Sequence, residues 1–75
     1  MNWKEAILYS KHNTARRTVF TENKDKITTN LLAYSDGSGY ILIAKNGKVD
    51  FELSHEATEK DILDLEKFED WEPGI

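Results

Sequence analysis

Two adjacent arginines, Arg16 and Arg17, are the side chains of this sequence best suited to recognise a ligand. A guanidinium group is a planar fork of N–H donors that matches a phosphate or a carboxylate. The Thr, Val and Phe residues around the pair predict a strand over 14–21, on which neighbouring side chains point to opposite faces. One of the two arginines must therefore point toward the covered side of a sheet, where its charge needs a partner.

Two kinds of partner fit that requirement, and the sequence leaves both open. The first is a salt bridge to the acidic C-terminal segment, for example to Asp70. The second is an anion site with aromatic walls, which would be drawn from Trp3, Phe20, Tyr40 and Trp71.

The remaining polar clusters do not assemble a catalytic or metal site. Two carboxylate pairs have the spacing of a shared face: Asp50 with Glu52 on a predicted strand, and Asp61 with Asp64 on a predicted helix. Solvent-facing positions explain both pairs, and neither has a third ligand at a fixed spacing. The consecutive residues 54–56 cannot adopt the geometry of a Ser-His-acid triad, and Gly37 and Gly39 precede no helix. We therefore expect no enzyme activity, no metal and no cofactor.

Size and composition indicate one small domain, 1–75, with a thin core. A chain of this length buries roughly 60–65% of its unfolded surface, so it usually needs a disulfide, a metal or a second copy. Cysteine is absent and only two histidines occur, which excludes disulfides and thiolate metal sites and favours a homo-oligomer. No apolar run approaches the roughly 18–20 residues of a membrane span, so we expect a cytoplasmic protein.

The charge of the chain is unevenly distributed. The net charge is −4, and the segment from Asp50 to Glu72 holds ten acidic residues against two lysines. An acidic protein is not expected to bind nucleic acid, because phosphates need a basic face. The acidic half either docks a basic partner, imitating nucleic acid, or forms a solvated surface.

Local signals predict the elements that must position these residues. Asn2 with Glu5 forms a helix-capping pair, and Thr58 with Asp61 forms another. Asn46-Gly47 is a hairpin signal, and the segment 36–39 predicts a second turn. Strands are predicted over 14–21, over 27–34 and over 40–45, the last a run apolar on both faces and therefore a covered central strand. Clean alternation predicts a further strand over 49–53, with Val49, Phe51 and Leu53 on a buried face. The expected fold is α+β: a small antiparallel sheet of about four strands, with an N-terminal and a C-terminal helix on one face.

Trp71 lies close to the end of the chain, in the segment Phe68-Glu69-Asp70-Trp71-Glu72-Pro73. Chain ends usually fray, so a large indole there is expected to be tied down. We expect its anchor beside the first helix, near Arg16 or Arg17.

Several short motifs together resemble a known family. They are the opening Met1-Asn2-Trp3-Lys4-Glu5-Ala6-Ile7, the doublet Ala15-Arg16-Arg17, and the closing Asp61-Ile62-Leu63 with Asp70-Trp71-Glu72-Pro73. These motifs are similar to those of small phage proteins of the Thoeris anti-defence type 2 group. The hairpin of 40–43 with 48–49 is similar to the strand pair that precedes the ending of that family.

The resemblance implies a non-catalytic protein that sequesters a cyclic nucleotide or an ADP-ribose-type immune signal as a homo-oligomer. In that case Arg16 or Arg17 would pair with phosphate, Phe20 or Tyr40 would stack on the base, and Asp70 would accept from a ribose hydroxyl or hold an arginine. The alternative is an acidic inhibitor that binds a bacterial defence protein, of the anti-CRISPR or anti-restriction type.

Overall fold

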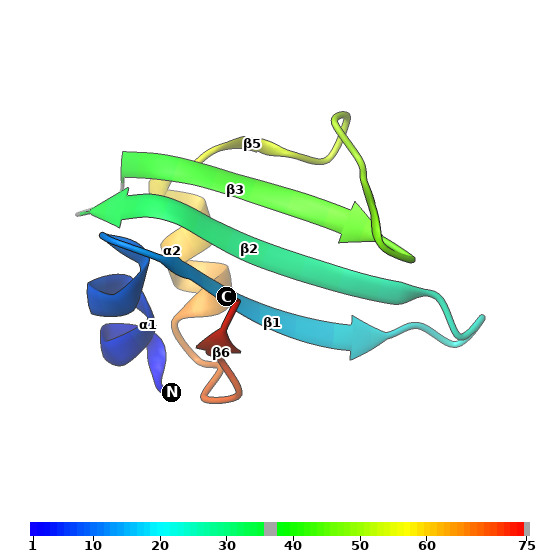
Figure 1. Ribbon diagram of the computed structural model, residues 1–75, viewed down its shortest axis with the longest axis horizontal. Helices are drawn as coiled ribbons and strands as arrows, with labels where there is room; N and C mark the ends of the chain where they lie inside the picture. The colour runs from blue at the N-terminus through cyan, green and yellow to red at the C-terminus, as the bar shows by residue number, and fades with distance from the viewer. Residues whose placement is uncertain (36–37, 75) are drawn as a thin grey trace.

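The computed structural model describes residues 1–35 and 38–74 as two helices and one antiparallel sheet (Figure 1). The elements in chain order are α1 (Trp3–Ser10), β1 (Thr14–Phe20), β2 (Lys26–Ser35), β3 (Ser38–Lys45), β4 (Lys48–Val49), β5 (His55–Glu56), α2 (Glu59–Leu65) and β6 (Glu72–Pro73). The strand order is β4-β3-β2-β1-β6, and β5 pairs with β3 beyond the end of β4. The expected α+β class and antiparallel sheet are confirmed, with three long strands and three of only two residues.

The capping pair predicted at the start of α1 is present. Asn2 Oδ1 accepts from the Glu5 backbone N–H at 2.9 Å, and Glu5 Oε1 accepts from the Asn2 N–H at 3.1 Å. This exchange satisfies two backbone donors that a helix start leaves without partners. Trp3, Ala6 and Ser10 then fall on one face and are buried.

The sheet buries one face under the helices. Ala15, Leu31 and Ile41 are cross-strand neighbours on β1, β2 and β3, and each is at most 1% exposed. Residues of both helices pack against this row, among them Ala6 of α1 and Ile62 of α2. Figure 1 shows α2 crossing the sheet on one side. We call this the helix-covered face, and its opposite the open face.

Trp71 closes the helix-covered face and is only 2% exposed. Its ring centroid lies 5.6 Å from that of Trp3, with the two rings tilted by 53°. The Met1 amino group donates to the Trp71 carbonyl, and the Trp71 N–H donates back to the Met1 carbonyl at 3.2 Å. β6 continues from Trp71 and pairs with Ala15 and Arg16. The prediction that Trp71 is anchored beside the first helix is confirmed.

The strand predicted over 49–53 is wrong. The Asn46-Gly47 hairpin forms, with φ angles of 51° and 84°, but the returning strand stops after Val49. Asp50 Oδ1 accepts from the Glu52 and Leu53 N–H groups, which turns the backbone away from β3. Phe51 and Leu53 are consequently 78% and 54% exposed, whereas the alternation had predicted a buried face.

A further expectation concerns the turn between β2 and β3. Asp36 and Gly37, half of the turn predicted over 36–39, lie outside the described residues, although β2 and β3 pair as that turn requires. α2 ends at Leu65, so Phe68 reaches the core from the segment that follows it. No helix within the described residues is long and apolar enough to cross a membrane.

Truncation of Trp71 tests whether it closes the core. We expect Trp71→Ala to lower the free energy of unfolding by about 3–5 kcal/mol, because a buried indole leaves a cavity. Urea unfolding followed by circular dichroism measures this change. Phe51→Ala is the matched control and should shift stability by no more than about 0.5 kcal/mol, because that ring is exposed. Equal losses for the two variants would contradict the role of Trp71.

Candidate binding site

Arg17 is held by two partners at the edge of the helix-covered face. Its Nε and one terminal nitrogen donate to the two carboxylate oxygens of Asp70, at 2.8 and 3.3 Å. The centre of its guanidinium group lies 3.5 Å from the centroid of the Phe68 ring. Its side chain is only 12% exposed. The salt bridge to Asp70, one of the two interpretations that the sequence left open, is therefore present.

Arg16 has a much weaker attachment on the open face. Its Nε donates to Glu72 Oε1 at 3.2 Å, and the two side chains are 43% and 54% exposed. An exposed pair of this kind contributes about 0–1 kcal/mol, because water and salt screen it. Of the two arginines, Arg16 is therefore the one whose salt bridge a ligand can replace.

The open face places Arg16 on the same side of the sheet as Tyr40. The register pairs Thr14 with Leu32 and Leu32 with Tyr40, so these three side chains form a row across β1, β2 and β3. Arg16 is two residues from Thr14 on β1 and shares its face. Two strand spacings separate Arg16 from the Tyr40 strand, which is roughly 10 Å. Leu32 and Leu42 are half-buried between them and provide an apolar floor.

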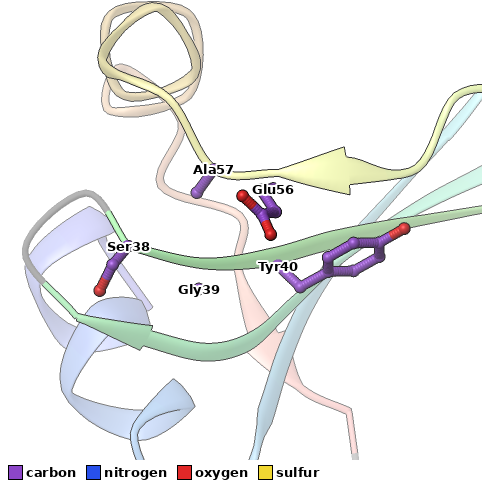
Figure 2. Close-up of a pocket in the computed structure, with 5 residues that line it drawn as sticks. All are labelled: Ser38, Gly39, Tyr40, Glu56 and Ala57. Carbon is purple, nitrogen blue, oxygen red and sulfur yellow. The ribbon is translucent and has the colours of Figure 1, made fainter.

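An open hollow of about 480 Å³ lies where Tyr40 meets β5, lined by Ser38, Gly39, Tyr40, Glu56 and Ala57. Figure 2 shows the Glu56 carboxylate between Ala57 and Tyr40, with the Tyr40 ring extending away from Gly39. The charged side chain of this hollow is acidic, so it suits a hydroxyl donor and repels a phosphate.

The structure therefore separates the five ligand-binding residues predicted from the sequence. Arg16 and Tyr40 share the open face. Phe20 points to that face as well, but it lies four residues beyond Arg16, roughly 13 Å along β1, and is 70% exposed. Arg17 and Asp70 bind each other instead.

Metal binding finds no support in the described part of the chain. No group of three or more His, Asp or Glu residues there is arranged to hold a metal ion. Of the pair Asp61 and Asp64, Asp61 is already engaged as a helix cap. Its carboxylate accepts from the Thr58 backbone N–H and hydroxyl at the start of α2.

His55 and Asp61 form an ion pair that the sequence did not predict. His55 Nε2 lies 2.9 Å from Asp61 Oδ1, and His55 Nδ1 lies 2.8 Å from the Leu53 carbonyl oxygen. Both ring nitrogens thus face acceptors, which only the doubly protonated imidazolium satisfies. The hydrogen bond to Asp61, followed by that to Leu53, raises the pKa of His55 above its ordinary value of 6.5.

The sequence also did not reveal the positions of three large apolar side chains. Phe68 lies against Arg17, and Phe51 and Leu53 project from the chain between β4 and β5. Asp50 was the available signal for the last two, since Asp commonly accepts from backbone N–H groups two and three residues later. No local sequence pattern predicts the contact between Phe68 and Arg17, because the two residues are far apart in the chain.

Comparisons of this chain with family models, curated proteins and solved structures returned no match. Function must therefore be inferred from the geometry and from the resemblance of the short motifs.

Substitution of each arginine tests their different roles. We expect Arg17→Gln to lower the free energy of unfolding by about 1–2 kcal/mol, through loss of the two hydrogen bonds and the ring contact, reduced by the exposure of Asp70. Arg16→Gln should lower it by no more than about 0.5 kcal/mol. Urea unfolding of the two variants measures the difference, and a larger loss for Arg16→Gln would contradict this assignment.

The His55 ion pair predicts a pH dependence of stability. Because the pKa is higher in the folded state, the pair contributes fully below pH 6.5 and its contribution is lost as pH rises through the raised pKa. Wild type should therefore lose stability relative to His55→Gln as pH rises from 6.5 through this raised pKa. Thermal unfolding across this range measures the effect, and parallel curves for the two proteins would contradict it.

Proposed function

We propose that this protein is a non-catalytic binding protein that sequesters a small nucleotide-type signal, of the cyclic nucleotide or ADP-ribose class, on the open face of its sheet. The observation that carries the proposal is the weak, exposed attachment of Arg16 on the same face as Tyr40. The resemblance to phage anti-defence proteins supports this ligand class and implies activity in the cytoplasm of a bacterial host.

Each part of such a ligand has a chemically suitable neighbour on this face. The phosphate would replace Glu72 as the partner of the Arg16 guanidinium group. The base would stack on Tyr40 or lie on the apolar floor beside it. A ribose hydroxyl would donate to Glu56, which lies next to Tyr40 in the register. Arg17 and Asp70 would keep their structural pairing.

A ligand on the open face of a single chain would remain partly exposed to water. A second copy facing it would enclose the ligand and would supplement the thin core. We therefore propose a homo-oligomer, which light scattering measures with and without ligand.

Calorimetric titration against a panel of cyclic mono- and dinucleotides and ADP-ribose isomers tests the proposed site. We expect one ligand of the panel to bind, and Arg16→Gln to weaken it about 10–100-fold, the value of a charged hydrogen-bonded contact. Tyr40→Leu should weaken it about 5–10-fold through loss of stacking.

Lys26→Gln is the control for the titration, because it removes one positive charge from the same face at a distance from Tyr40. It should change affinity less than about 2-fold. Absence of binding across the panel at high micromolar concentration would refute the sequestering function. Equal losses for Lys26→Gln and Arg16→Gln would refute the site.

A further inference from the structure

The segment 50–54, which we call the edge loop, displays two large apolar side chains at the border of the sheet. Phe51 and Leu53 are 78% and 54% exposed, and Val49 just before them is 40% exposed. Figure 1 shows the chain between β3 and β5 projecting beyond the sheet. Three such residues within five positions form a local apolar patch, unlike the single exposed residues that are ordinary on protein surfaces.

The edge loop is held in one conformation by its own polar groups. Asp50 Oδ1 accepts from the N–H groups of Glu52 and Leu53, at 3.0 and 3.3 Å. Ser54 Oγ donates to the Asp50 carbonyl at 2.7 Å and accepts from the Ile43 N–H of β3 at 2.9 Å. The Asp50 N–H also donates to the Ile43 carbonyl at 2.8 Å, so both ends of the loop are joined to β3 while Phe51 and Leu53 remain exposed.

Acidic side chains outnumber basic ones around the edge loop. From Lys48 to Glu59 the chain carries four carboxylates, Asp50, Glu52, Glu56 and Glu59, against Lys48 and the imidazolium of His55, which is paired with Asp61. An apolar patch inside an acidic border is complementary to an apolar pocket with a basic border.

We propose that the edge loop is a docking site for a partner protein that has an apolar pocket bordered by Lys or Arg, with Phe51 and Leu53 as the inserted side chains. A loop already fixed in its bound conformation loses little conformational entropy on binding, which favours affinity. A buried aromatic ring at the centre of a contact is the usual kind of residue that dominates the binding energy. This docking site is separate from the open face and does not depend on the function proposed there.

Two other occupants fit the charges less well. A second copy that contacts this loop across a two-fold axis would bring the same acidic residues face to face, which repels. A bacterial membrane surface carries anionic lipids, which the carboxylates around Phe51 also repel.

Site-specific photocrosslinking in the protein's native cells tests the docking site. p-Benzoylphenylalanine is placed at position 51 in one variant and, as a matched control, at position 8 in another, because Leu8 is 64% exposed on α1. The protein captured at position 51 is then purified and titrated with wild type, Phe51→Ala, Leu53→Ala and Leu8→Ala at two salt concentrations.

We expect an adduct at position 51 that is absent at position 8. Phe51→Ala should weaken binding of the captured protein at least 10-fold and Leu8→Ala less than 2-fold, and affinity should fall as salt rises. No adduct specific to position 51, an adduct with a second copy, an affinity independent of salt, or equal effects of Phe51→Ala and Leu8→Ala would each overturn the proposal. Nucleotide titration of Phe51→Ala should match wild type, so failure of this site is distinguishable from failure of the open face.

Discussion

The contact between Trp71 and Trp3 is the interaction on which the rest of the fold depends. It fixes the last strand against the first helix, and the paired hydrogen bonds between Met1 and Trp71 join the two ends of the described chain. Trp71 Nε1 is buried without a hydrogen-bond partner among the described residues, which costs about 1–3 kcal/mol. Burial of an indole of 150–250 Å² contributes about 4–6 kcal/mol, so the net effect of the residue is stabilising.

Their neighbouring positions on β1 place the two arginines on opposite faces of the sheet, where the Arg17 side chain is only 12% exposed and that of Arg16 is 43% exposed. Because Trp71 anchors the segment before β6, Asp70 lies beside Arg17 on the helix-covered side and Glu72 beside Arg16 on the open side. Phe68 and Asp70 together immobilise Arg17, whereas Arg16 keeps one exposed contact. The same terminal segment that completes the core thus leaves one cation of the pair accessible to a ligand.

Local signals predicted most of the fold, and contacts distant in sequence account for what they missed. The capping pair of Asn2 with Glu5 and the Asn46-Gly47 turn act within a few residues, so the sequence shows them directly. The alternation over 49–53 shows only that a strand there would have one apolar face. It does not show that a strand forms, and the hydrogen bond from the Glu52 N–H to Asp50 turns the backbone instead. Likewise the sequence predicted a possible Arg17–Asp70 bridge, but Phe68 enters that contact only because Trp71 sets the path of the terminal segment.

The edge loop shows how a polar residue can determine where apolar residues are exposed. Had the strand continued past Val49 in the same register, Phe51 and Leu53 would lie on the open face opposite Leu42 and Tyr40, because Val49 pairs with Ala44. Asp50 and Ser54 instead satisfy the backbone groups of a turn, and His55 joins its end to Asp61 at the start of α2. A 75-residue chain that exposes two large apolar side chains forgoes roughly 1.5–3 kcal/mol of burial for each of them. Cover by a partner protein, as we propose for the edge loop, would bury these side chains on binding and recover this free energy.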